Sequence, residues 1–160
     1  MGLDDFQKGV RAMADVADVL LKQMESERAQ AMHSETQRSV LSNMILVLSA
    51  AGLGFLSQRG LRPSALVITL PLLGIGLYGA LATAKFYERF LFHYRQECAM
   101  RSRLDALLPE LGLVDTVRQV EADHDDRNPI SRKVRIHVLW ESLHLSIAAI
   151  GLALTIVSVL

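Results

Sequence analysis

The chain has 160 residues and equal numbers of basic and acidic side chains, 17 of each, so its formal net charge is zero. This length predicts one compact unit rather than two domains, and the single cysteine, Cys98, excludes an internal disulfide. The zero net charge conceals a strong segregation. Every charged residue lies outside three long apolar runs, at residues 39–58, 63–84 and 142–160.

Residues 1–38 carry charges of both signs throughout and lack an apolar core, so no cleavable signal peptide is expected. They contain no proline, and no glycine after Gly9, which predicts a helix that continues into the first apolar run. Steps of four and three residues separate Phe6, Val10, Met13, Ala17, Leu20 and Met24. This coiled-coil seam has two open interpretations: packing against the same chain, or contact with another subunit.

The runs at residues 39–58 and 63–84 are separated only by the basic turn at residues 59–62, which is the pattern of a transmembrane hairpin. At about 1.5 Å of rise per residue, each run makes a helix of roughly 30 Å, the thickness of the hydrocarbon core of a bilayer. The third run follows Trp140, a residue type favoured at membrane interfaces. A large buried core in a soluble helical protein is the competing interpretation, but such helices usually carry a polar face.

Between the second and third runs, the helix is expected to continue from Lys85 to Leu108, where Pro109 and Gly112 break it. A short helix, a turn over residues 123–129 and a last helix from about Ile130 should follow. Nothing in the sequence indicates a strand. The predicted fold is therefore an all-α membrane protein with three transmembrane helices and long cytosolic helical extensions. Its expected parts are residues 1–38, 39–84, 85–141 and 142–160.

Lys and Arg tend to remain on the cytoplasmic side of a membrane. The turn between the first two runs holds only Arg59 and Arg62, whereas the opposite ends of the runs are flanked by many more basic residues. We therefore expect a multi-pass protein of the inner (cell) membrane, with a cytoplasmic N-terminus and a periplasmic C-terminus.

Several enzyme-like patterns have simpler explanations. The glycines of residues 74–79 fit a dinucleotide fingerprint, but they lie within an apolar run, where small residues typically allow helices to pack closely. Arg132 and His137 have the R-x4-H spacing of some ribonucleases, although the basic residues here are better explained as anchors at lipid headgroups. The acidic stretch at residues 123–126 lacks the spacing of a metal site. We expect no enzyme, cofactor, metal site or catalytic residue.

Each apolar run carries a mild stripe of small and polar residues when wound at about 100° per residue. The stripes comprise Ser39, Ser42, Asn43, Ser49, Ala50, Gly54 and Ser57 in the first run, Ala65, Thr69, Gly76, Ala80 and Thr83 in the second, and His144, Ala148, Gly151, Thr155 and Ser158 in the third. Leu41, Met44, Ile45, Leu48 and Phe55 lie opposite the first stripe. Such stripes indicate either helix packing or a water-filled conduit shared by several copies. The candidate pore-lining residues are Ser42, Asn43, Ser49 and His144.

The two spans with a tight turn, the helix continuing through Glu88, Arg89 and His93, and the later segment 103–107 resemble the SLATT family of bacterial membrane effectors. The similarity covers roughly residues 32–108, and the third span departs from the two-span pattern of that family. The resemblance implies a homo-oligomeric ion channel or pore that disrupts the host membrane in anti-phage defence. Glu88, Arg89 and His93 lie at the cytosolic end of the second span. They are either gating or ligand-sensing candidates or a helix-end charge cluster that fixes the depth of the helix in the bilayer. A regulatory nucleotide or oligonucleotide and a cytosolic partner protein are both open as the activating partner. A non-conducting scaffold that recruits a cytosolic partner protein is the alternative.

Overall fold

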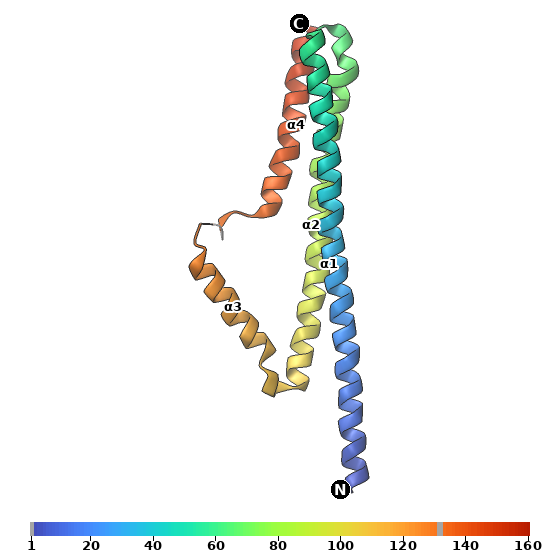
Figure 1. Ribbon diagram of the computed structural model, residues 1–160, viewed down its shortest axis with the longest axis vertical. Helices are drawn as coiled ribbons and strands as arrows, with labels where there is room; N and C mark the ends of the chain where they lie inside the picture. Colours follow the sequence, from blue (N-terminus) through green and yellow to red (C-terminus); the bar gives the residue numbers. More distant parts are fainter. Residues whose placement is uncertain (1, 131–132) are drawn as a thin grey trace. The chain divides into compact units, whose positions relative to one another are not determined.

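The computed structural model describes residues 2–130 and 133–160, and within them it excludes the side chain of Phe6. These residues are helical apart from short connections, with no strand among them, as predicted. The elements in chain order are α1 (Leu3–Arg59), the 3-10 turn η1 (Pro63–Ala65), α2 (Leu66–Leu107), the 3-10 turn η2 (Pro109–Leu111), α3 (Leu113–Arg127) and α4 (Ile136–Val159) (Figure 1).

The chain divides into two compact units. The base unit combines Met1–His33 with Arg89–Lys133, and the hairpin unit combines Ser34–Glu88 with Val134–Leu160. Both long helices, α1 and α2, contribute a part to each unit. The length of the chain predicted one compact unit, and the structure instead has two.

In the hairpin unit, α1 ends at Arg59 because Gly60 adopts a positive φ of 76°, a conformation that glycine reaches without steric cost. The amide of Gly60 closes the helix by donating to the carbonyl oxygen of Leu56 at 2.9 Å. Pro63 then starts η1, where its fixed φ and missing N–H suit the first turn of a helix. The C-terminal end of α4 lies at the same end of this unit, against η1 (Figure 1).

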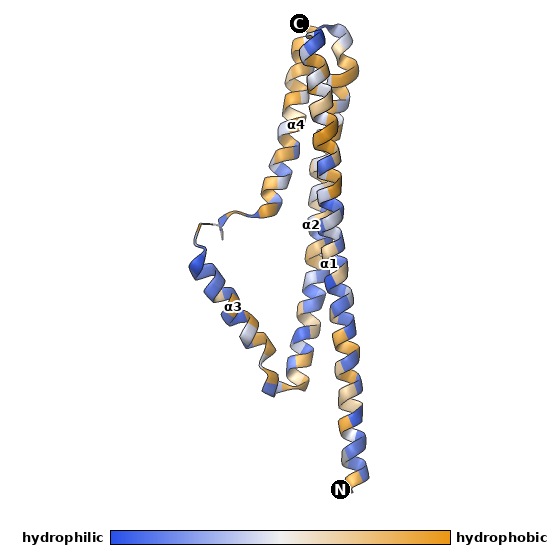
Figure 2. Cartoon of the chain, viewed as in Figure 1, coloured by the Kyte–Doolittle hydropathy of each residue, from blue (hydrophilic) through white to orange (hydrophobic). Residues whose placement is uncertain are grey.

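Three helices are long and apolar enough to cross a membrane: α1, the continuous segment of η1 with α2, and α4. Within their most apolar windows only 22% of the residues of α1, and 28% of those of each of the other two, are buried. Large apolar side chains such as Val47, Leu81 and Ile156 are therefore exposed. Figure 2 shows the hydrophobic colouring concentrated along α4 and along the parts of α1 and α2 near the turn that joins them. A soluble bundle would instead hide such residues.

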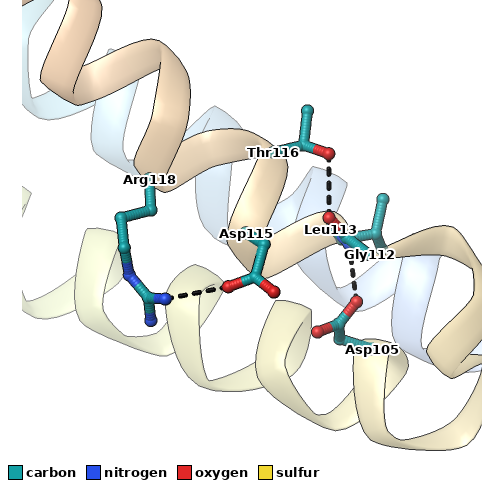
Figure 3. Close-up of polar contacts among 6 residues, drawn as sticks. All are labelled: Asp105, Gly112, Leu113, Asp115, Thr116 and Arg118. Carbon is teal, nitrogen blue, oxygen red and sulfur yellow. Dashed lines mark hydrogen bonds and ion pairs between the residues drawn. The ribbon is translucent and has the colours of Figure 1, made fainter.

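In the base unit, the corner between α2 and α3 is built from a glycine and an aspartate (Figure 3). Gly112 takes a left-handed φ of 52°, which ends η2 and places the start of α3 beside the last turns of α2. The backbone amide of Leu113 then donates to Oδ1 of Asp105 at 2.6 Å. A carboxylate at this point also complements the positive end of the α3 dipole.

Two predicted boundaries differ from the structure. The acidic residues 123–126 belong to α3 and not to a turn, because Arg127 pairs with Asp123 one helical turn earlier, at 2.8 Å, and Asn128 closes the helix on the carbonyl of His124. The last helix begins at Ile136 rather than near Ile130. The backbone of Arg135 is extended, with φ −84° and ψ 115°, so helical geometry starts only after it.

Candidate functional site

The small residues of α2 and α4 bring the backbones of these helices into contact inside the hairpin unit. A Cβ atom added to Gly76 would lie 2.4 Å from the backbone nitrogen of Ala148, and one added to Gly151 would lie 2.5 Å from the nitrogen of Leu73. Only glycine fits at such a distance. Gly76 of the glycine fingerprint in α2 therefore serves close helix packing, as the sequence indicated, whereas a Cβ added to Gly74 would meet nothing within 4 Å.

A histidine from α4 and a serine from α1 form a hydrogen bond in the interior of the same unit. Oγ of Ser42 lies 2.9 Å from Nε2 of His144, and both side chains are fully buried. The other ring nitrogen, Nδ1, faces Gly79, where an added Cβ would be 2.5 Å away. Gly79 thus makes room for the imidazole. The pair ties α1 to α4 through side chains that are costly to bury without partners.

The interior carries further polar atoms. The hydroxyl groups of Ser49, Thr69 and Thr83 are buried and have no hydrogen-bond partner among the described residues, and the same holds for Nδ1 of His144. Each of these side chains lies on the stripe predicted for its helix. The stripes of α2 and α4 accordingly meet within one chain, with Ala65, Thr69, Gly76, Thr83, His144, Ala148, Gly151 and Ser158 buried.

The stripe predicted for α1 separates into two faces. Ser42 and Ser49 are buried in the hairpin unit together with Ile45, which the sequence analysis placed on the opposite side. Ile45 fills the space beside Gly79, where an added Cβ would touch its Cδ1 at 2.8 Å. The glycine leaves a gap that a large side chain must occupy, which explains why this isoleucine is drawn inward.

The second face of α1 is exposed in the single chain. We call it the outward stripe, and it consists of Ser39, Asn43, Ala50, Gly54 and Ser57. These residues lie within about 60° of arc around the helix. Of the four predicted pore-lining residues, Asn43 therefore lies outside, while Ser42, Ser49 and His144 lie inside the hairpin unit.

The end of the hairpin unit away from the turn holds a buried arginine. Arg38 is only 3% exposed, forms an ion pair with Glu35 and lies with its guanidinium carbon 5.7 Å from the centre of the Trp140 ring. In the same unit, the rings of Tyr87 on α2 and His137 on α4 stack with their centroids 4.0 Å apart. His137 therefore has a packing role, and Arg132, its partner in the ribonuclease pattern, lies outside the described residues.

The predicted gating residues fall into different settings. In the hairpin unit, Glu88 forms an exposed ion pair with Lys85 at 2.6 Å. In the base unit, Arg89 is exposed, whereas His93 is largely buried with its Nδ1 2.7 Å from Oε2 of Glu27 on α1.

Glu27 is the residue that sequence reasoning missed. Its second carboxylate oxygen, Oε1, accepts a hydrogen bond from Gln23 at 2.8 Å, so both oxygens are engaged. One feature of the sequence could have identified it. Glu27 lies three residues after Met24, so it continues the apolar seam of α1, and its carboxylate is buried in the structure. A buried charge requires a partner, and His93 provides it across the interface between α1 and α2.

A second polar contact in the base unit involves Tyr94 and Cys98 on α2. Partial burial, followed by a hydrogen bond with Cys98 and the charge of Glu121, raises the pKa of the Tyr94 hydroxyl above its ordinary value of 10.0. The shift favours the neutral phenol, although the Tyr94 side chain is still 37% exposed.

Over residues 2–130 and 133–160, no three His, Cys, Asp or Glu side chains gather closely enough to hold a metal ion. Comparisons of the whole chain with protein-family models, with curated proteins and with solved structures found no match. The functional argument therefore depends on the residues described above.

Proposed function

We propose that this chain is a membrane protein whose three spans are the apolar parts of α1, α2 and α4, with the N-terminus in the cytoplasm and the C-terminus in the periplasm. Three helices of sufficient length and apolarity support insertion, as do their outward-facing apolar side chains. The orientation is supported by the excess of Lys and Arg outside the turn at residues 59–62.

Several copies assemble in the membrane around an ion-conducting path that the outward stripe of α1 lines. The observation that carries this proposal is the exposed amide of Asn43 on a helix that would cross the bilayer. An amide that faces hydrocarbon costs several kcal/mol without a hydrogen-bond partner, roughly 4–8 on hydrocarbon transfer scales. Water or a second copy removes that cost, whereas lipid cannot.

The inner polar residues do not account for this face. Ser42 and Ser49 already pack against α2 and α4 within one chain, and the tight contacts at Gly76 and Gly151 leave little room for water between these helices. The outward stripe is polar surface beyond what the packing of one chain uses. A ring of several α1 helices places it around a common axis, as in other channels built from polar-lined helices.

The cellular role of such a path follows from the resemblance to SLATT effectors. An open pore dissipates ion gradients and harms the host cell, which limits phage production. The base unit is where a cytosolic signal would act. There the exposed guanidinium of Arg89 is available to an anionic ligand such as a nucleotide, whereas His93 is engaged by Glu27.

The proposal is tested with purified full-length protein in liposomes that enclose a fluorescent ion indicator. The protein should produce ion flux, and Asn43→Leu should change it strongly because leucine removes the polar lining. Met44→Leu is the matched control, since Met44 is the next residue, is exposed and lies on the apolar side of α1.

Flux equal to that of empty liposomes with every nucleotide tested would reject conduction. A scaffold that recruits a partner protein would then be the better account, and it predicts that Asn43→Leu has no effect on partner binding. Equal flux for Asn43→Leu and Met44→Leu would reject the assignment of the lining to this stripe.

A further inference from the structure

The N-terminal segment of α1, residues 3–16, extends beyond the end of α2, the helix that packs against the next part of α1. In the base unit α2 ends at Leu107, whose side chain lines an open groove with Val16, Val19 and Leu20. Every described side chain from Gly2 to Val16 is exposed. A helix of this length without packing partners is only marginally stable in water.

The exposed segment continues an apolar seam that is buried further along the same helix. Leu20 is 8% exposed, whereas Leu3, Val10 and Met13 are 82%, 51% and 47% exposed. The two interpretations of the predicted seam thus apply to different parts of it. Leu20 packs within its own chain, whereas the apolar side chains of Leu3, Val10 and Met13 are exposed.

The charges of this region are confined to the opposite side of the helix. In a heptad assignment that places Val10 at position a and Met13 at position d, all the charged residues between Leu3 and Met24 fall at positions b, c and f. They are Asp4, Asp5, Lys8, Arg11, Asp15, Asp18 and Lys22. Lys22 pairs with Asp18 at 2.8 Å on this charged side, where both are well exposed. The hydrogen bond and charge of the Asp18 carboxylate raise the pKa of Lys22.

The edges of the seam carry no charge. Positions e and g hold Gln7, Gly9, Ala14, Val16, Leu21 and Gln23. When identical helices associate in parallel, the edge positions of neighbouring copies face each other, and like charges there would repel. A seam with uncharged edges is therefore compatible with identical partners. Apart from Gln7 and Gln23, the edge residues are small or apolar, which widens the contact face so that each helix can touch two neighbours rather than one.

We propose that residues 3–16 of α1 form a parallel helical bundle with the same segment of at least two further copies of this chain. The proposal rests on the proposed function in one respect: copies inserted in the membrane with the same orientation present this segment side by side and parallel. The bundle fixes the number of subunits from outside the bilayer. It brings Val10 and Met13 of each copy to the centre, next to the same residues of its neighbours.

Disulfide trapping in full-length protein tests the arrangement. Cys98→Ser removes the native thiol, and Met13→Cys or Val10→Cys introduces one at the centre of the bundle. A disulfide forms readily only where two Cα atoms come within about 7 Å. Mild oxidation in liposomes should therefore convert most of these two variants to covalent dimers. Ala12→Cys is the matched control, because position 12 lies on the charged side and should remain monomeric.

Equal cross-linking at positions 12 and 13, or none at position 13, would overturn the bundle. A second pair of variants measures its contribution to assembly: Met13→Asp should lower the mass of the detergent-solubilised oligomer, and Ala12→Asp should not. Parallel flux measurements separate this inference from conduction. Cross-linking at position 13 without ion flux rejects the channel and retains the bundle, whereas flux without cross-linking rejects the bundle and retains the channel.

Discussion

Gly76→Ala should weaken the packing of the hairpin unit far more than the addition of one methyl group suggests. The new Cβ would lie 2.4 Å from the nitrogen, 2.8 Å from the Cα and 2.9 Å from the Cβ of Ala148. Two of these contacts are with backbone atoms, which cannot rotate away. To restore an ordinary separation of about 3.5 Å, α2 and α4 must move apart by about 1 Å.

That displacement has a predictable cost. Overpacking of a tight interior typically destabilises by about 1–3 kcal/mol, which corresponds to a roughly 5- to 150-fold decrease in the equilibrium constant for helix association. Lipid tails are as apolar as the side chains of the interface, so no hydrophobic gain compensates for the lost contacts. Reversible unfolding in bicelles, followed by the fluorescence of Trp140 on α4, measures the difference between variant and wild type.

Gly74→Ala is the matched control. Gly74 lies two residues earlier on the same helix, and an added Cβ there meets nothing within 4 Å. Its replacement should leave stability unchanged or raise it slightly, because alanine is the better helix former. Equal stability of the two variants would refute the contact between α2 and α4 on which the hairpin unit is built.

Three further outcomes are expected. Ser42→Ala should destabilise the hairpin unit by about 1 kcal/mol in bicelle unfolding, because Nε2 of His144 loses its partner, and no loss would contradict the buried hydrogen bond. Glu27→Ala and His93→Ala should be non-additive, with a coupling of about 0.5–3 kcal/mol in a double-mutant cycle, whereas additive effects would show that the 2.7 Å contact does not form. Tyr94 should ionise above pH 10.0 in a difference absorbance titration against Tyr94→Phe. Since the unfolded chain loses that proton first, the stability contributed by the neutral phenol should be present below pH 10 and decline as pH rises through the folded pKa.

Most helix positions and two of the three packing faces could be predicted from the sequence, whereas the end of α3 and the start of α4 could not. Gly60 and Pro63 mark the hairpin turn, and Pro109 with Gly112 marks the break before α3, because these residues have restricted or unusual backbone preferences. The small residues of α2 and α4 identified their contact face correctly. Glycine and alanine have few roles within an apolar run other than close helix approach.

The division of the α1 face could not be predicted. A helical wheel shows that Ser42 and Asn43 are both polar, but not which of them meets another helix of the same chain. That choice depends on where the interior has space, and Gly79 on α2 creates the space that Ile45 of α1 fills. The contact between Glu27 and His93 was missed for a related reason, since it joins residues 66 positions apart on two helices.

Cysteine accessibility tests the lining of the proposed ion path most directly. In the Cys98→Ser background, single cysteines replace Asn43 or Gly54 on the outward stripe, or Met44 or Leu48 on the apolar side of α1. A membrane-impermeant thiosulfonate is applied to proteoliposomes during flux measurements. The account predicts that the reagent modifies the two stripe positions and changes the flux through them, while the two apolar positions stay unmodified in lipid. Unreactive stripe positions, or equal reactivity on both sides of α1, would contradict it.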